Sequence, residues 1–196
     1  MKKTYTIIGL LIIIIGLIFI FKKDDTVAPV VTDSNTPVYT NPTQSFSVSV
    51  PKDFTIDEKY SYNISPTRSI SGTKYTIPAS LAKGTNLSTD SYVSVESIPD
   101  ADSCTAERFF ESAPQAPDTV TENGVTYSVN STQDAGAGNR YEETVYAIKD
   151  SKPCIAVRYF IHYGAIQNYP EGAVKEFDRS ALLQQFDAIR KSLKIK

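Results

Sequence analysis

The side chains that could carry chemistry in this sequence are two cysteines and a single histidine. Cys104 and Cys154 are the only cysteines among 196 residues, and His162 is the only histidine. An even number of cysteines in a domain outside the cytoplasm favours a disulfide, and the N-terminal segment described below is expected to place the domain there. We therefore predict a Cys104–Cys154 bond with a structural role.

A reactive thiolate is the catalytic alternative to this disulfide. Cys104 is predicted to lie near the start of a short helix, where the pKa of a thiol is lowered, and His162 could serve as its base. Cys154 cannot pair with His162 in this way, because they lie eight residues apart on one predicted strand, at about 3.3 Å per residue. The remaining catalytic hypothesis is a hydrolase or thiol enzyme that uses Cys104 and His162.

Charged residues on two predicted strands form the other candidate group. If the strands pair, Arg140, Glu142, Glu143 and Arg158 could line a cleft as a patch of mixed charge, although cross-strand salt bridges on a solvated face would explain them equally well. Glu142 and Glu143 are not expected to act as a glycosidase pair, because adjacent residues of a strand point to opposite faces. His162 is expected to be a partly buried, hydrogen-bonded histidine on the strand face of Arg158.

Several classes of site are excluded by what the sequence lacks. A single histidine rules out most zinc sites, and the patterns GxSxG, GxxxxGK[ST] and the dinucleotide-binding glycines do not occur. We therefore expect no catalytic, cofactor-binding or metal-binding residue. The net charge is -2 with both signs interspersed, so nucleic acid is not an expected partner.

An apolar segment at the N-terminus predicts a membrane anchor. Residues 5–21 carry no charge, and a run of this length is at the short end of what spans a bilayer. Lys2 and Lys3 precede the run, whereas Lys22 and Lys23 are followed at once by two aspartates. This balance favours an N-terminus inside the cytoplasm and a C-terminal domain outside it. We expect a single-pass protein of the cytoplasmic membrane, attached through this helix.

A cleaved signal peptide is the competing interpretation of the same segment. The nearest cleavage pattern is Thr26-Val27-Ala28, and Pro29 follows it, where proline fits poorly after a cut. An uncleaved anchor is therefore favoured. The predicted organisation is an anchor at residues 1–23, a flexible linker rich in Pro, Thr, Asp and Asn at 24–44, and one domain at 45–196.

The domain is predicted to be α+β, with an antiparallel β-sheet packed against helices. A short helix is expected after Asp102 and Ser103, and an amphipathic helix from Phe177 to Leu193. Asn123-Gly124 predicts a tight hairpin, and residues 78–91 are expected to form a long loop. The predicted strands have alternating or β-rich patterns and cover residues 45–50, 69–77, 92–98, 125–130, 140–149 and 154–163.

Two segments of this domain resemble small bacterial membrane-anchored or exported proteins with a PsbP/Mog1-like domain. They are SFSVSVPKDF at its start and FDAIRKSLKI at its end. The segments SGTKYTIPASLAKGTNLSTDSYVSVE, NRYEETVYA and AVRYFIHYG resemble uncharacterised exported bacterial proteins. Where PsbP-like domains have a known role, they act mainly in binding or assembly. The resemblance therefore implies a non-enzymatic module with a protein partner in the cell envelope, and it transfers no functional residue.

The leading functional hypothesis is thus a binding or assembly module on the outer face of a bacterial cytoplasmic membrane. The thiol or hydrolase enzyme remains the first alternative. A periplasmic inhibitor of a secreted enzyme is the second, and it differs from the leading hypothesis only in its partner. The exposed loop from Lys83 to Asp90 is a natural place to test for such inhibition.

Overall fold

The computed structural model describes residues 36–41, 46–112 and 115–196. The chain divides into two units, Met1–Val31 and Thr32–Lys196, and all described residues belong to the second. The predicted anchor at residues 1–23 lies outside the described residues. Among the residues that the structure does describe, no helix is long and apolar enough to cross a membrane.

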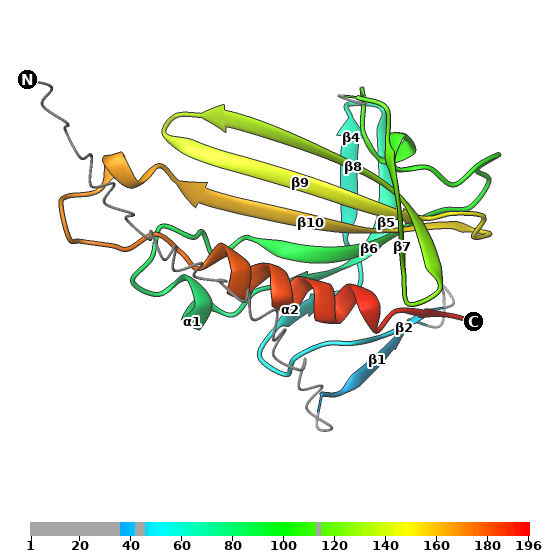
Figure 1. Cartoon of the computed structure of the whole chain (residues 1–196), viewed down its shortest axis with the longest axis horizontal. Coiled ribbons are helices and arrows are strands. Elements are labelled where there is room, and N and C mark those ends of the chain that lie inside the picture. The colour runs from blue at the N-terminus through cyan, green and yellow to red at the C-terminus, as the bar shows by residue number, and fades with distance from the viewer. Residues whose placement is uncertain (1–35, 42–45, 113–114) are drawn as a thin grey trace, which may run out of the picture. The chain divides into compact units, whose positions relative to one another are not determined.

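A large antiparallel sheet forms the centre of the second unit (Figure 1). Its strand order is β3-β5-β6-β10-β9-β8-β7, and β4 pairs with β5 outside this path. The three long strands form an antiparallel meander, because β9 pairs with both β8 and β10. The strands are β3 (Thr55–Asp57), β4 (Ser61–Ser65), β5 (Arg68–Thr76), β6 (Tyr92–Ile98), β7 (Asp118–Glu122), β8 (Val125–Gly136), β9 (Asn139–Ile148) and β10 (Cys154–Gly164).

Two tight turns fix the register of strands β7, β8 and β9. Asn123 and Gly124 have φ values of 51° and 79° and join β7 to β8. A two-residue turn with both φ values positive matches the twist of a hairpin, so the predicted hairpin is confirmed. Ala137 and Gly138, with φ values of 48° and 81°, make the equivalent turn between β8 and β9.

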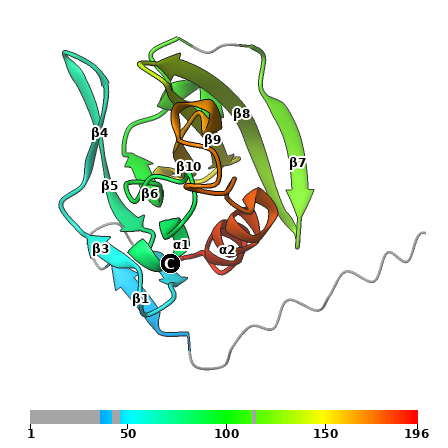
Figure 2. The same cartoon turned by 90° about the vertical axis from the view of Figure 1, so that its left-hand side faces the viewer.

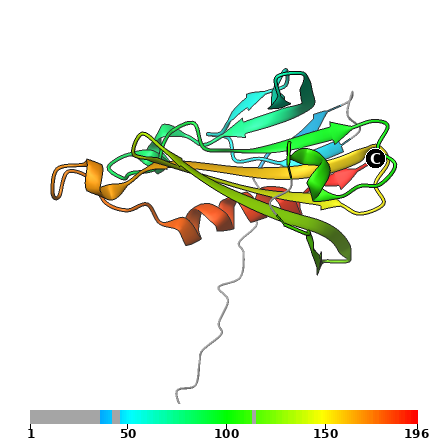
Figure 3. The same ribbon diagram turned by 90° about the horizontal axis from the view of Figure 1, so that it is seen from above.

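A smaller sheet and one helix cover one face of the large sheet. The small sheet contains β1 (Val38–Asn41), β2 (Phe46–Ser49) and β11 (Lys194–Ile195), in the order β1-β2-β11. The helix α2 (Arg179–Lys191) begins after Asp178, whose side chain accepts a hydrogen bond from the Ala181 backbone N–H. Figure 3 shows α2 on one side of the long strands and the β4–β5 hairpin on the other.

The large sheet buries side chains on both faces, because successive strand residues point to opposite sides. On the α2 face, the larger core gathers β2, the odd-numbered residues of β10 and three residues of the helix, Leu182, Phe186 and Ile189. On the other face, a smaller core surrounds the start of β10 and includes Phe109 and Phe110. Figure 2 shows the β4–β5 hairpin and β7 at opposite sides of the sheet.

The architecture is therefore mostly antiparallel β-sheet with helices, as the α+β prediction stated. Three local predictions differ from the structure. Strand β1 lies inside the segment 24–44 that was expected to be a linker, because it pairs with β2. The helix expected after Asp102 and Ser103 is a single 3₁₀ turn, η1 (Ala106–Phe109), preceded by Thr105. The loop expected at 78–91 contains a short helix, α1 (Ala79–Ala82).

Candidate functional site: a buried arginine cluster beside an aromatic row

The predicted disulfide is present. Cys104 and Cys154 are bonded, with 4.9 Å between their Cα atoms, and both side chains are buried. The bond joins the segment before η1 to the first residue of β10. Because the chain has no other cysteine, the thiol enzyme built on Cys104 has no free thiol in this structure.

His162 lies at the opposite end of β10 and has partners of its own. Its Nδ1 is 2.8 Å from a carboxylate oxygen of Asp90, and its Nε2 is 3.1 Å from Oδ1 of Asn139. The ring stacks on Tyr141 with 4.5 Å between centroids. His162 is thus the partly buried, hydrogen-bonded strand histidine that the sequence predicted, and it shares a strand face with Arg158.

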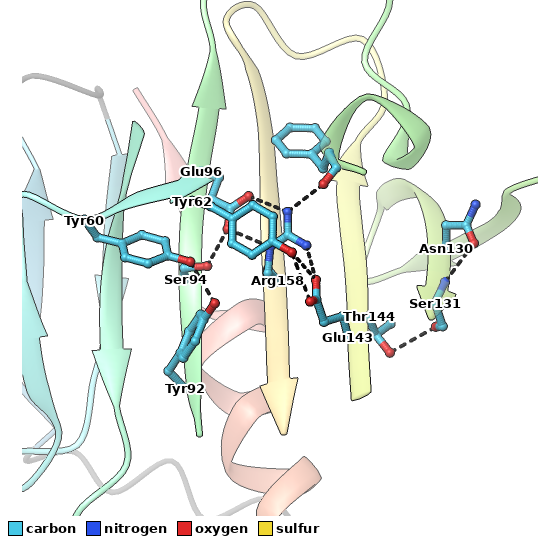
Figure 4. Close-up of polar contacts among 11 residues, drawn as sticks. Tyr60, Tyr62, Tyr92, Ser94, Glu96, Asn130, Ser131, Glu143, Thr144 and Arg158 are labelled. Carbon is cyan, nitrogen blue, oxygen red and sulfur yellow. Dashed lines mark hydrogen bonds and ion pairs between the residues drawn. The ribbon is translucent and has the colours of Figure 1, made fainter. Parts of the chain in front are cut away.

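Arg158 is the centre of a buried polar cluster on the face away from α2 (Figure 4). Its Nε and Nη2 donate to the two carboxylate oxygens of Glu96 at 2.8 and 3.0 Å. Its Nη1 donates to Glu143 at 2.5 Å, and Nη2 also donates to the Phe109 carbonyl at 2.8 Å. Arg158 and Glu96 both have side chains that are 0% exposed. Such a buried pair is tolerated only when its hydrogen bonds are satisfied.

The strand register explains how these residues meet. Arg158 on β10 is directly opposite Ser94 on β6, and Glu96 stands two residues further along the same face of β6. On the other side, Arg158 is opposite Val145 on β9, two residues from Glu143. Diagonal neighbours on adjacent strands are within reach of long side chains. Ser94 completes the arrangement by donating a hydrogen bond to Glu96 at 2.8 Å.

Aromatic rings close the cluster from above the sheet. The Tyr62 ring lies over the guanidinium of Arg158, with 3.6 Å between the guanidinium carbon and the ring centroid. The same tyrosine donates from its hydroxyl to both oxygens of Glu143 at 2.9 and 3.0 Å. The Phe110 ring lies 5.5 Å from the guanidinium carbon. The guanidinium is therefore paired with two carboxylates and lies within cation–π distance of two aromatic rings.

The surroundings of Arg158 and Tyr62 raise the pKa values of both side chains. Burial works against the charge of Arg158, but the neighbouring charge and hydrogen bonds of Glu96 outweigh this and raise its pKa. Burial raises the pKa of the Tyr62 hydroxyl to about 12, although the Arg158 charge acts in the opposite direction. At neutral pH this arginine therefore stays charged and this tyrosine stays neutral.

An aromatic row continues along the same face from the cluster. We use this name for Tyr60, Tyr92, Phe160, Tyr141 and His162. Two pairs of the row are directly opposite across strands, Tyr92 with Phe160 and Tyr141 with His162. Centroid distances along the row are 5.6, 4.9, 6.3 and 4.5 Å in the order given. Tyr92 is buried and the other four are half-buried, so the row presents ring surface to solvent.

Hydrogen bonds and a cation fix one end of the row. The hydroxyls of Tyr60 and Tyr92 are 2.7 Å apart, and burial raises the pKa of both. Lys74 on β5 places its Nζ 5.2 and 5.7 Å from the centroids of these two rings. At the other end, Asp90 from the loop before β6 contacts His162. The row therefore has a positive group at one end and a carboxylate at the other.

No family model and no curated protein matches this chain. Among solved structures, it is similar to a protein from Bacteroides thetaiotaomicron VPI-5482, with 8% sequence identity and a TM-score of 0.43. The alignment covers 81% of this chain and 48% of that one, so this chain spans about half the length of that protein. A likeness of this degree contributes no functional argument.

The charged patch expected from the sequence is divided between the two faces of the sheet. Glu143 joins Arg158 as expected, but both are inaccessible or nearly so, and the pairing is not on a solvated face. Glu142 points to the α2 side, where it accepts hydrogen bonds from Arg179 and Tyr163. Burial opposes ionisation of Glu142, but these hydrogen bonds outweigh it and lower its pKa. Arg140 is exposed and takes no part in the cluster.

A second buried arginine lies on the α2 face and has no role in the row. Arg190 of the helix donates to the Tyr159 hydroxyl at 2.8 Å and to Glu122 at 2.6 Å. Its guanidinium carbon lies 4.9 and 4.2 Å from the ring centroids of Tyr127 and Tyr146. These contacts hold α2 against β7, β8 and β9. Within the described residues, no group of three or more His, Cys, Asp or Glu side chains could hold a metal ion.

Gly72, the residue opposite Glu96, has no side chain that would crowd the arginine cluster. Gly72 on β5 pairs with Glu96, and a Cβ added to Gly72 would lie 2.7 Å from the Val95 carbonyl oxygen and 3.1 Å from Cγ of Glu96. We therefore expect Gly72→Ala to lower the free energy of unfolding by about 1–3 kcal/mol, as overpacking does. Urea unfolding measures this loss.

Gly136→Ala is the matched control for this substitution. Nothing lies within 4 Å of an added Cβ at Gly136, so the free energy of unfolding should stay within about 0.5 kcal/mol of the wild type. Equal stability of the two variants would show that the space beside Glu96 is not restricted.

Proposed function

We propose that this protein is a non-enzymatic binding or assembly module, held on the outer face of the cytoplasmic membrane by residues 1–23. Its aromatic row binds a protein partner in the cell envelope. The resemblance of its first and last segments to PsbP/Mog1-like domains supports the same class of function.

The observation that carries this proposal is the exposure of the row. Half-buried tyrosine and phenylalanine rings are enriched at protein recognition surfaces, because they offer large contact areas with little loss of side-chain freedom. Tyr141 and Phe160 stand in the middle of the row, with ring centroids 6.3 Å apart. The cross-strand pairs fix the rings before any partner arrives, which lowers the entropic cost of binding.

The reactive side chains in and around the row favour binding over catalysis. Arg158 is fully engaged by Glu96, Glu143 and a backbone carbonyl. The two cysteines form a disulfide, and His162 contacts Asp90 and Asn139. An enzyme needs a nucleophile or proton-transfer group that is available to substrate. The titratable groups of this cluster are instead committed to one another.

A cross-linking pull-down from native membranes tests the proposal, with the full anchored chain as bait and mass spectrometry as readout. The test variant carries Tyr141→Ala and Phe160→Ala. Truncating aromatic residues at the centre of an interface costs about 2 kcal/mol or more, so we expect the captured partner to fall by about tenfold or more. Thermal unfolding of each variant confirms that the domain remains folded.

The control variant is Tyr169→Ala, which removes another partly exposed tyrosine from a segment outside the row. It should capture the partner at the wild-type level. Equal capture by both variants would exclude the row as the binding surface, and recovery of bait alone from every membrane preparation would contradict a protein partner. A partner that is a secreted enzyme, together with loss of its inhibition after substitution of Lys83 or Thr89, would favour the inhibitor. These two residues of the loop 83–90 are exposed, whereas Asn86 and Leu87 are buried.

A further inference from the structure

An apolar patch lies at the edge of the small sheet, close to the start of the described residues. It surrounds an open pocket of about 280 Å³. Val38 and Ile56 are its most exposed apolar side chains, at 66% and 41%. The residues that line the pocket are Pro37, Val38, Tyr39, Val50, Pro51, Lys52, Phe54 and Ile56. We call this surface the β1 patch.

The position of the β1 patch in the chain limits its distance from the membrane. The predicted anchor ends at residue 23, and the patch begins at Pro37, so residues 24–36 connect them. Thirteen residues span at most about 45 Å when fully extended. The patch is thus the first described surface after the predicted anchor, and the chain keeps it within that distance of the bilayer.

The composition of the patch fits the interfacial region of a membrane. Val38 and Ile56 offer exposed aliphatic surface that can enter the headgroup region. Behind them the half-buried Tyr39 ring packs against Phe46 and Tyr75. Lys52 is its only cation, and the acidic Asp53 follows it at once. With charges so balanced, contact with lipid would depend on burial of apolar surface and not on attraction to anionic headgroups.

We propose that the β1 patch rests on the surface of the membrane that holds the anchor, with Val38 and Ile56 inserted among the lipid headgroups. The occupant of the patch is lipid. This inference depends on the membrane attachment in the proposed function. The contact sets the orientation of the domain and leaves the aromatic row free for its partner.

A single tryptophan can report this contact, because the natural chain contains none. The full-length chain is reconstituted into phosphatidylcholine vesicles with and without lipids brominated near the headgroup, which quench nearby tryptophan. Ile56→Trp places the reporter in the patch. Tyr169→Trp places it in the segment after η2 (Ile166–Asn168), in the orange region at the far left of Figure 1, away from β1.

We expect quenching of the Ile56→Trp protein to be several-fold stronger than quenching of the Tyr169→Trp protein, and to be unchanged between low and high salt. Adding Val38→Asp to Ile56→Trp should remove most of this difference, because a charge opposes insertion among lipids. Equal quenching at the two positions would overturn the proposal. So would a reporter at position 56 that is shielded from water but not quenched by lipid, since that result identifies a second copy of the chain as the occupant.

Alkaline extraction of the same vesicles tests the membrane anchor separately from the lipid contact of the β1 patch. Wild-type protein that stays with the vesicles at high pH is held by a spanning segment. If the protein is retained but both positions are quenched equally, only the proposed contact of the β1 patch with lipid is overturned. Loss of the wild-type protein from the vesicles would overturn both the anchor and the inference that depends on it.

Discussion

Replacing Arg158 by methionine is expected to lower the free energy of unfolding by about 3–5 kcal/mol, because it leaves a buried carboxylate without its partner. Glu96 has no exposed side-chain surface and accepts two hydrogen bonds from this arginine. Once the guanidinium is gone, Ser94 is the remaining side chain that donates to Glu96 among the contacts described above. Urea unfolding followed by circular dichroism measures the loss.

A matched control separates burial from charge alone. Arg179→Met also removes an arginine from a carboxylate, in this case Glu142, but the Arg179 side chain is 43% exposed. Exposed ion pairs contribute about 0–1 kcal/mol, so this variant should remain close to the wild type. If the two substitutions cost the same, desolvation of Glu96 does not explain the effect.

A second substitution, at Glu96, tests whether the unpaired buried carboxylate causes the loss of stability. Arg158→Met combined with Glu96→Gln removes both members of the fully buried pair. The remaining carboxylate, Glu143, is 15% exposed and keeps the Tyr62 hydroxyl as a donor. Replacing both partners is less costly than removing one of them. We expect the double variant to regain part of the lost stability, and a double variant less stable than Arg158→Met would contradict this account.

Removing the disulfide is the second large effect that we expect. Cys104 and Cys154 are 50 residues apart in sequence, and closing a loop of this length stabilises a fold by about 4 kcal/mol in the chain-entropy model. The Cys104→Ala, Cys154→Ala double variant should lose stability of this order in urea unfolding. Both positions lie in the smaller core beside Phe109 and Phe110, so the region of η1 should become the first to exchange its amide hydrogens.

The reduced wild-type protein is the control for the alanine substitutions. It retains both sulfur atoms and lacks only the covalent link, so a loss similar to that of the alanine variant assigns the effect to the bond. A full loss in the alanine variant and none on reduction would instead assign it to packing of the sulfur atoms. Full stability in both cases would show that this cross-link does not constrain the unfolded chain.

Local patterns in the sequence predicted the elements whose conformation depends on near neighbours. Asn123-Gly124 predicted a hairpin because two positive φ values are accessible to these residues at little cost. The spacing of apolar residues predicted the C-terminal helix, and the alternation in residues 45–50 predicted β2. The cysteine pair followed from an even number of cysteines in a domain expected to lie outside the cytoplasm. Each inference needed only a short segment or a count.

The candidate site could not be predicted in the same way, because its residues meet only through strand order. Glu96 and Arg158 are 62 residues apart and become neighbours when β6 pairs with β10. Nothing in the local pattern of either strand specifies that partner. Tyr62 arrives from β4, which is not among the strands that the sequence predicted. A signal was nevertheless present, because the even-numbered residues Tyr92, Ser94 and Glu96 mark one face of β6 as polar and aromatic.

The sequence by itself thus determined the disulfide pair, the main strands, the tight turn and the helix, since φ, ψ and side-chain periodicity are short-range properties. The tertiary structure alone decided that Arg158 is buried between Glu96 and Glu143, and that Glu142 faces away from them. It also placed β1 within the segment expected to be a linker. The physical reason is the same in each case. Strand pairing and burial depend on contacts between distant segments, and those contacts select which face of each strand is covered.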